Sequence, residues 1–409
     1  ENIPAPKGDI DGPLQVMVTT LDYDEYVGRI AIGRVVRGRI KNGQNVTVLD
    51  GENQRKGRIG RLYGYEGLKR REVEEAAMGD IIAVTGLDDV NIGDTIADTE
   101  NPEALPTIAI DEPTLSMLFS VNTSPFAGRE GDFVTSRHLR DRLFREVETN
   151  VSLRVDETDS PDSFKVSGRG ELHLSILIET MRREGFEFQV GKPEVIYKNI
   201  QGQRCEPMEL LTVDVPQDFM GAVMEKLGTR KAELINMGEI SGYLRMEFVI
   251  PARGLIGFRN ELLTSTKGNG IMNHVFHGYA PYKGDIQGRT RGALVAFEPG
   301  ETTGYGIYSV QDRGVMFVTP GQEIYTGQIV GENAREQDMD VNPCKKKHVT
   351  NMRSSSADEA IRLTSPRIHS LEQALEYIND DELVEVTPKS IRLRKAILDR
   401  TARARAKKG

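Results

Sequence analysis

The chain has 409 residues, of which 38% are hydrophobic and 28% charged, and its formal net charge is −9. This length allows two to four domains of ordinary size. The composition is that of a soluble globular protein, and no apolar run approaches the roughly 18 residues that a membrane-spanning helix needs. The negative charge excludes a polycation, so any nucleic-acid binding must come from local basic patches.

Cysteine usage and the N-terminus indicate a cytoplasmic setting. Cys205 and Cys344 are the two cysteines. They cannot form a disulfide framework, and neither has the spacing of a zinc site. The first residues carry no basic start and no apolar core, so they do not form a signal peptide. The sequence does not begin with Met, and we expect a fragment whose residues 1–11 are a linker.

Residues 12–100 have the pattern of a small β-barrel. Short apolar strands alternate with glycine turns, and the dipeptides Asn42-Gly43 and Asp50-Gly51 are hairpin signals. Short strands at intervals of 8–12 residues are typical of sandwiches and barrels.

Residues 112–198 predict the order β-α-β-β-α-β, which is ferredoxin-like. Leu115 to Val121 is the first strand, and Thr135 to Asn150 is the first helix. Gly168 and Gly170 form the turn before the second helix, and Gly185 ends it. The spacing in this helix predicts one apolar face made of Leu172, Ile176, Leu177 and Met181.

The same order is expected again in residues 205–282. Glu206-Pro207 echoes Glu112-Pro113 at the start of the first repeat. Helices are predicted over Gln217–Leu227 and Gly254–Thr266, with a hairpin between them and a last strand after them.

Residues 283–409 predict a mostly β domain with terminal helices. Strands and turns run to residue 331, and a polar stretch follows, with a helix at Ser370–Ile378. Thr387-Pro388 is a capping signal and predicts that a basic helix opens there. The fold class is thus multi-domain α+β: a β-barrel, two ferredoxin-like βαββαβ domains and this last domain.

Two basic segments are the candidate RNA-binding site. Residues 341–356 form a basic loop with no acid and few large apolar groups, and residues 389–409 hold one acid among many Lys and Arg. Such runs in a net-negative protein favour binding of a polyanion, although a solvated surface remains the alternative. No catalytic or metal-ligating constellation is found. The candidate residues are Lys345, Lys346, Lys347, His348, Asn351, Arg353, Lys389, Arg392, Arg394, Lys395 and Arg400.

Several strings resemble translational GTPases. SGRGELHL followed by GKPEVIY resembles the third domain of elongation factor G, and PARGLIGFRNELLTSTKGNG resembles its last domain. VGRIAIGRVVRGRIKNGQNV resembles the second-domain barrel of these factors. Elongation factor G has an extra domain where this chain has a short joint, and LepA lacks that domain too. DRGVMFVTPGQEIYTGQIVGE and VNPCKKKHVTNMRSSSADEAIRL resemble the C-terminal domain of the BipA (TypA) family.

The resemblance implies a ribosome-binding portion of a BipA-type GTPase, involved in stress response and large-subunit assembly. Its implied partners are both ribosomal subunits, rRNA and the acceptor end of tRNA, with no membrane, and the protein is expected to be a cytoplasmic monomer. No GxxxxGK[ST] phosphate loop is present, so we expect a chain that is not an enzyme, with GTP and Mg²⁺ bound only by a missing domain. The alternatives are a stand-alone RNA-binding protein using its ferredoxin-like sheets and a metabolic enzyme with paired ferredoxin-like domains.

Overall fold

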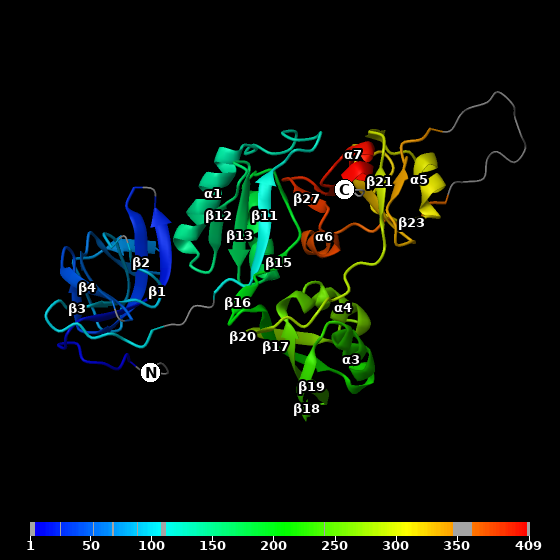
Figure 1. Cartoon of the computed structure of the whole chain (residues 1–409). Coiled ribbons are helices and arrows are strands. Elements are labelled where there is room, and N and C mark those ends of the chain that lie inside the picture. Colours follow the sequence, from blue (N-terminus) through cyan, green and yellow to red (C-terminus); the bar gives the residue numbers. More distant parts are fainter. Residues whose placement is uncertain are drawn as a thin grey trace, which may run out of the picture. The chain divides into compact units, whose positions relative to one another are not determined.

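The computed structural model describes residues 5–24, 26–51, 53–67, 69–87, 89–107, 112–240, 242–346 and 362–406. The chain forms two compact units (Figure 1), one made of Glu1–Glu112 with Asp141–Val155 and the other of Pro113–Arg140 with Asp156–Gly409. Among these described residues, none of the helices has the length and apolar character needed to cross a membrane. Strands outnumber helices, so the protein is a strand-rich, mixed α/β chain of several domains.

The first unit is built on an eight-stranded antiparallel sheet with the order β5-β4-β10-β1-β2-β9-β6-β7, beside the two-stranded ladder β3-β8. Val16, Val35, Ile82 and Ile96 lie in its core and are at most 1% exposed. The strands are β1 (Gln15–Asp24), β2 (Gly28–Arg37), β3 (Arg39–Lys41), β4 (Asn45–Asp50), β5 (Asn53–Arg58), β6 (Leu62–Glu66), β7 (Lys69–Glu72), β8 (Glu75–Ala77), β9 (Ile81–Val84) and β10 (Thr95–Ala97).

The two dipeptides predicted as hairpin turns behave differently. Asp50-Gly51 joins β4 to β5, and Asp50 pairs with Asn53 across the turn. Asn42-Gly43 also reverses the chain, but β3 before it pairs with β8 and not with β4. The Asn42 N–H continues that ladder by donating to Glu74 O, so the backbone groups of β3 are already satisfied elsewhere.

After the first sheet, the chain contains two repeats of one element order: strand, helix, strand, strand, helix, strand. Most of the two repeats belongs to the second unit, while Asp141–Val155 of the first repeat, with most of its first helix, is counted with the first unit. The four strands have the order β12-β13-β11-β14 in the first repeat and β18-β19-β17-β20 in the second. The first comprises β11 (Leu115–Val121), α1 (Ser136–Thr149), β12 (Arg154–Glu157), β13 (Ser163–Gly168), α2 (Glu171–Arg183), β14 (Phe188–Val190) and β15 (Glu194–Val195). The second comprises β16 (Lys198–Ile200), β17 (Gln203–Val215), η1 (Gln217–Phe219), α3 (Met220–Thr229), β18 (Glu233–Ile240), β19 (Tyr243–Pro251), η2 (Ala252–Gly254), α4 (Phe258–Ser265) and β20 (Ile271–Pro281).

The apolar face of α2 differs from the prediction. Leu177 and Met181 are buried as expected, but Leu172 is 58% and Ile176 56% exposed. Leu174 and Ile178 are buried in their place. At 100° per residue, positions 174, 177, 178 and 181 form one stripe that packs on the sheet, and positions 172 and 176 project away from it.

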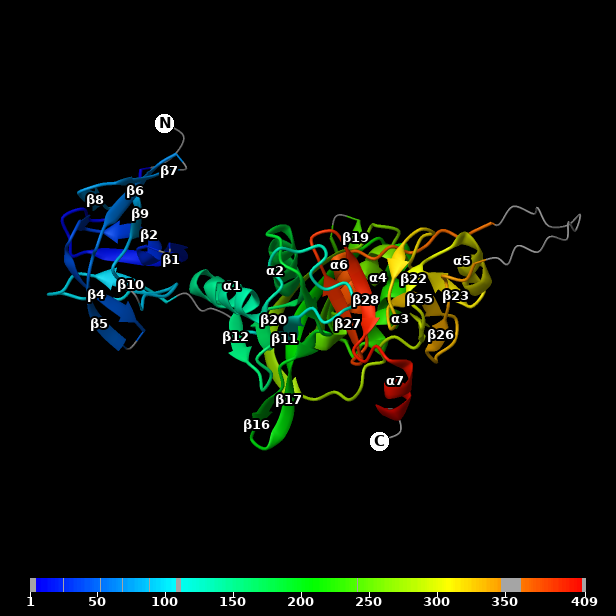
Figure 2. The same ribbon diagram turned by 90° about the horizontal axis from the view of Figure 1, so that it is seen from above.

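Residues 283–406 complete the second unit. A four-stranded sheet has the order β23-β25-β21-β26, and β22 pairs with β24. β27 and β28 lie side by side (Figure 2), and β27 pairs with β14, so the chain returns to extend the sheet of the first repeat. The elements are β21 (Ala293–Ala296), β22 (Gly300–Glu301), α5 (Gly304–Gln311), β23 (Gly314–Met316), β24 (Glu323–Ile324), β25 (Ile329–Asn333), β26 (Met339–Val341), α6 (Leu371–Tyr377), β27 (Glu382–Val386), β28 (Ile391–Lys395) and α7 (Arg400–Ala406).

Two predictions for this last region are wrong. The basic helix expected after Thr387-Pro388 is strand β28, because these residues form the turn of the β27–β28 hairpin. There the Ser390 N–H donates to Thr387 Oγ1 at 2.8 Å. Proline's fixed φ suits a turn as well as a first helical turn. Helix α5 was expected as strands and turns, yet Thr303 caps it by accepting from the Gly306 N–H.

Candidate nucleic-acid interface

The predicted basic loop starts from a firmly anchored strand end. Thr303, which caps α5, donates its hydroxyl to Lys345 O at 2.6 Å, and its N–H donates to Pro343 O at 3.0 Å. The Cys344 N–H closes a local turn onto Asn342 Oδ1. Lys345 and Lys346 themselves are exposed. A hydrogen-bonded backbone therefore carries two lysine side chains into solvent.

The return of the loop is fixed to the other end of the same helix. Gln311, the last residue of α5, donates to Arg362 O at 3.1 Å and accepts from the Thr364 N–H at 3.0 Å. An eight-residue helix is about 12 Å long, so both ends of the loop are tied to one short rigid element. Lys347, His348, Asn351 and Arg353 lie outside the described residues.

The packing around α5 explains the close approach of the strand end. A Cβ atom added at Gly306 would lie 2.1 Å from Pro343 O. Glycine at this position therefore allows the backbone of residues 343–345 to lie directly against the first turn of α5.

Two candidates from the second basic segment lie at the surface. Lys389 is exposed in the turn between β27 and β28. Arg400, whose side chain is 68% exposed, forms an ion pair with Asp340 Oδ2 at 2.8 Å, and Arg403 contacts the other oxygen of that carboxylate. Because Asp340 lies in β26, directly before the loop, the structure places Arg400 near its base.

The other three candidates, Arg392, Arg394 and Lys395, do not present their charges to solvent. Arg394 is 3% and Lys395 2% exposed. Lys395 Nζ contacts Glu382 Oε1 at 2.8 Å, along with Asp338 and Asp381. A buried cation with such partners cannot leave them for a phosphate without exposing an uncompensated charge. The prediction of RNA contacts by these three residues is therefore corrected.

Arg392 belongs to a buried polar network centred on Glu385. Its guanidinium contacts Glu385 Oε1 at 3.2 Å and the carboxylate of Glu130. Tyr325 donates its hydroxyl to Glu385 Oε2 at 2.6 Å, and Ser124 donates to Oε1 at 2.9 Å. Burial and the charge of Glu385 raise the pKa of Tyr325 well above its usual value, so Tyr325 remains a donor. This network joins β27 and β28 to the loop after β11.

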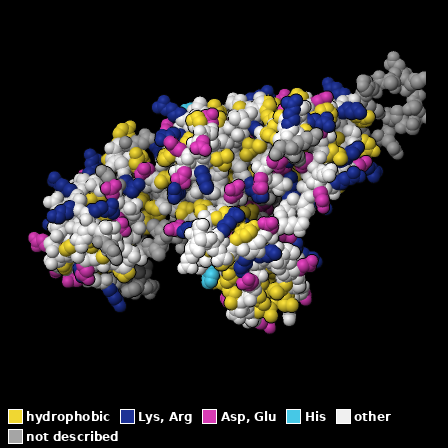
Figure 3. All heavy atoms as spheres, in the orientation of Figure 1, with side chains coloured by type: hydrophobic (Ala, Val, Ile, Leu, Met, Phe, Trp, Pro, Cys, Tyr) yellow, Lys and Arg dark blue, Asp and Glu magenta, His cyan; other side chains and the backbone are white. Residues whose placement is uncertain are grey.

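Basic and acidic side chains are interspersed on the face of the molecule drawn in Figure 3. That face shows no broad basic surface among the described residues.

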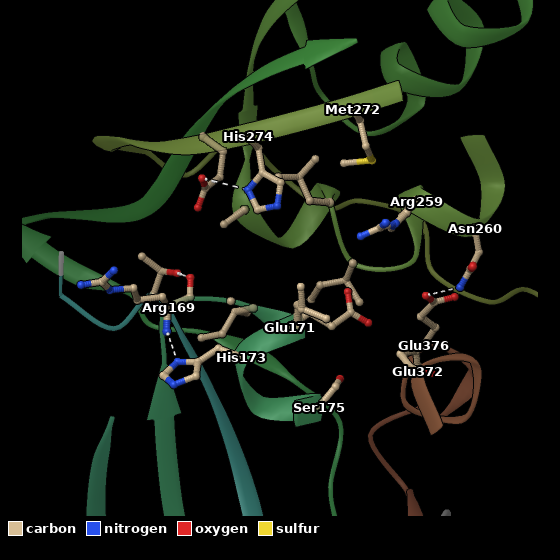
Figure 4. A pocket seen from close by; sticks show the side chains of 18 of the residues that line it. Arg169, Glu171, His173, Ser175, Arg259, Asn260, Met272, His274, Glu372 and Glu376 are labelled. Carbon is tan, nitrogen blue, oxygen red and sulfur yellow. Dashed lines mark hydrogen bonds and ion pairs between the residues drawn. The ribbon is translucent and has the colours of Figure 1, made fainter. Parts of the chain in front are cut away.

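A second site was not predicted. A cavity of about 710 Å³ opens where α2, the segment from η2 to α4, β20 and α6 meet within the second unit (Figure 4). Burial, followed by the charge of Glu376, raises the pKa of Glu171 at its wall to about 7. The contributing residues come from distant parts of the chain, from Thr114 to Glu376, and each reads as an ordinary surface residue in the sequence. Its polar and charged lining residues are Thr114, Arg169, Glu171, His173, Ser175, Glu209, Arg259, Asn260, Asn273, His274, Ser370, Glu372 and Glu376.

Three family models match successive parts of the chain. The model of elongation factor Tu domain 2 matches residues 28–97, and that of the elongation factor G C-terminus matches residues 203–290. The model of the TypA/BipA C-terminal domain matches residues 291–400.

Similar proteins cover almost the whole chain. A protein of Synechocystis sp. is 54% identical over 96% of this chain and 66% of its own length. Proteins of Bacillus subtilis and Escherichia coli are 51% and 50% identical over 100% and 99% of this chain, and each is covered over 67% of its length. All three carry the name large ribosomal subunit assembly factor BipA.

These matches correct the prediction that the chain is not an enzyme. That prediction treated the chain as a remainder from which the GTPase domain is absent. The alignments with these GTPase-family relatives cover 96–100% of this chain. The lack of a phosphate loop among these 409 residues does not make the protein a non-enzyme.

Proposed function

Because this chain belongs to the BipA family of translational GTPases, we propose that it binds the ribosome and acts in assembly of the large subunit. We propose that residues 341–356 contact rRNA and the acceptor end of tRNA. The observation that carries the proposal is the identity of 50–54% to assembly factors along 96–100% of the chain. Action in the cytoplasm, as a monomer and under stress, is part of the same proposal.

The geometry at the loop base supports the RNA contact. Lys345 and Lys346 are exposed while their backbone is held against α5. Because this backbone is already ordered, a phosphate that binds these lysines has less conformational entropy to overcome than on a free chain. Arg400 and Lys389 extend the exposed positive charge, and each is proposed as an additional phosphate contact.

The domain organisation belongs to the same proposal. We propose a barrel over residues 12–100, ferredoxin-like domains over 112–198 and 205–282, and a family-specific domain over 283–409. The common strand order of the two repeats supports the ferredoxin-like assignment. Several weakly binding domains on one chain would gain affinity through effective concentration and could engage both subunits.

The alternative, RNA recognition by the ferredoxin-like sheets, lacks a supporting feature. Such recognition uses aromatic side chains on central strands to stack bases. In the second repeat, Tyr243 at the first position of β19 is the one aromatic among the residues of β17 and β19 that alternate with the buried core. The others along the middle of these strands are Leu210, Thr212, Asp214, Arg245, Glu247 and Val249, which do not form a stacking surface.

Cosedimentation tests the proposal. The full chain is centrifuged with 70S ribosomes, with isolated 50S and 30S subunits, and with 50S precursors, at several salt concentrations. We expect saturable binding that naked rRNA competes for only weakly, because several domains contact an assembled surface. Absence of binding to every particle at low salt would contradict ribosome binding, and equal competition by naked rRNA would favour the sheet-based alternative.

A further inference from the structure

The cavity beside α2 gathers three carboxylates from two helices. Glu171 lies in the first turn of α2, and Glu372 and Glu376 lie one turn apart on α6. All three line the cavity (Figure 4). Its volume of about 710 Å³ lies within the range of about 300–1,000 Å³ that is usual for small-ligand sites.

Two polar atoms at this wall have unmet hydrogen-bonding capacity. Glu171 Oε1 is buried and has no hydrogen-bond partner in the described part of the chain, and the same holds for Ser175 Oγ. Ser175 is only 2% exposed. The two residues are four positions apart and so lie on one face of α2. Leaving a buried polar atom unpaired is unfavourable, so a ligand group that donates to Glu171 Oε1 and contacts Ser175 Oγ would be stabilised.

The carboxylates also repel one another. Burial and the charge of Glu376 raise the pKa of Glu171, and burial raises the pKa of Glu376. Neutral donors satisfy part of the cluster: Asn260 Nδ2 lies 2.6 Å from Glu376, and Ser370 Oγ lies 2.9 Å from Glu372. A positive charge in the cavity would reduce this repulsion.

One cation close to this cluster already has other partners. Arg230, the C-cap residue of α3, has a charge that partly opposes the rise in the pKa of Glu171 and Glu376. Its guanidinium is held by Glu261 and by the carbonyl oxygens of Gly254 and Ile256. The remaining charged or titratable groups around the cavity are Arg169 and His173 beside the start of α2, Arg259 on α4, Glu209 on β17 and its partner His274 on β20. The start of α2 adds a partial positive charge, which the three carboxylates outweigh.

We propose that this cavity binds an organic cation, with an ammonium or guanidinium group held by Glu171, Glu372 and Glu376 and by the Ser175 hydroxyl. No group of three His, Cys, Asp or Glu side chains among the described residues is placed to hold a metal ion, which favours a larger cation with several N–H donors. Leu172 and Ile256 line the same cavity and can contact the methylene groups of such a ligand. The cation can come from a free polyamine or from a Lys or Arg side chain of a basic protein segment.

Calorimetry with the full chain tests this inference, with spermidine and a lysine-rich decapeptide as the two ligands. We expect one site per chain and binding about 10-fold tighter at pH 8 than at pH 6. The reason is that Glu171, with its pKa raised to about 7, is mostly protonated at pH 6 and mostly charged at pH 8. Glu171→Gln should weaken binding at pH 8 about 10-fold or more and remove most of the pH dependence.

Glu225→Gln is the matched control, because Glu225 is exposed on α3 and does not line the cavity. Thermal melting of each variant confirms that it is folded. Tighter binding of spermidine identifies a free polyamine, and tighter binding of the peptide identifies a protein side chain. The proposal is overturned if neither ligand binds, or if Glu225→Gln weakens binding as much as Glu171→Gln. Because no ribosome is used, its failure would leave the ribosome-binding proposal untouched.

Discussion

The two basic segments of this chain contain the same kinds of side chains and have opposite fates. At residues 345–346 the lysines are exposed, and the hydroxyl of Thr303, the cap of α5, holds only the backbone of Lys345. In β28, Arg392 and Lys395 are paired with carboxylates of β27 and its neighbours, and Arg394 is buried with a hydroxyl and carbonyl oxygens as partners. Glu382 and Glu385 on β27 pair in register with Lys395 and Arg392 on β28, which places opposite charges directly across the hairpin.

This difference teaches that a run of positive charge does not by itself locate a binding surface. What decides is whether acidic residues elsewhere in the chain reach the cations in the fold. The β28 cations meet acids from distant parts of the sequence, such as Glu130 and Asp338. No acid occurs between residues 341 and 356 in the sequence. Charge buried with partners supports folding, whereas charge left in solvent remains available to a ligand.

Removal of a buried carboxylate should have the largest effect on stability. Glu382 accepts from Arg289 at 2.8 and 3.0 Å and from Lys395 at 2.8 Å. Glu382→Ala leaves both cations buried without this partner, and we expect the free energy of unfolding to fall by about 3–5 kcal/mol. Urea denaturation monitored by circular dichroism measures the change.

Asp380→Ala is the control for this substitution. Asp380 lies two positions away, its side chain is 85% exposed, and its ion pair with Lys192 is at the surface. We expect a change of at most about 1 kcal/mol. Equal effects of the two substitutions would show that the distinction between buried and exposed charge drawn here is wrong.

Sequence patterns predicted local elements best where one signal had one structural meaning. The strand Leu115–Val121 has the predicted bounds, and α6 (Leu371–Tyr377) lies within the predicted helix Ser370–Ile378, with Ser370 and Gln373 forming a capping box at its start. Asp50-Gly51 gave the predicted hairpin. In each case the information lies within a few neighbouring residues.

Prediction failed where one signal fits two structures or where the deciding partner is distant. Pro388 suits both a helix start and a hairpin turn, and the pairing of β28 with β27 settles the choice. Helix α5 contains glycines, which are poor helix formers, so its sequence indicated a turn, and the cap at Thr303 is the one local signal of a helix. The cavity beside α2 could not be predicted, since Glu171 and Glu376 come together only through tertiary packing.

Glu171 is also a buried carboxylate, but unlike Glu382 it has no ion pair with a cation in the described part of the chain. Its effect on stability should therefore depend on pH. Burial raises the pKa of Glu171 from 4.5 in the unfolded chain to about 7 in the folded one. Its charged form is therefore disfavoured by folding, and the destabilisation is absent below pH 4.5, grows between pH 4.5 and 7 and is complete above pH 7. Glu171→Gln should therefore raise the free energy of unfolding above that of the wild type more at pH 8 than at pH 5. The gain should be at most about 3 kcal/mol, because one pKa unit corresponds to about 1.4 kcal/mol.

Urea midpoints of wild type and variant at pH 5 and pH 8 measure this effect, with Glu225→Gln as the exposed control. An identical difference between wild type and Glu171→Gln at the two pH values would show that Glu171 has an ordinary pKa. A larger loss of stability at pH 8 would reverse the sign and mean that the charged carboxylate has a cationic partner.

The smallest effect on stability is expected for the exposed lysines, and there the change should appear in binding instead. Lys345→Ala and Lys346→Ala should each alter the free energy of unfolding by no more than about 0.5 kcal/mol. If each lysine neutralises one phosphate, each substitution should reduce the slope of log affinity for ribosomes against log salt by roughly 0.7–0.9, and the pair by about twice that. The control is Lys165→Ala, which removes an exposed charge on β13 and should leave the slope unchanged.

Slopes from cosedimentation over a salt series decide between a phosphate contact and a solvated surface. An unchanged slope in the double variant would remove residues 345–346 from the proposed interface and make Lys389 and Arg400 the next residues to substitute, since both are exposed.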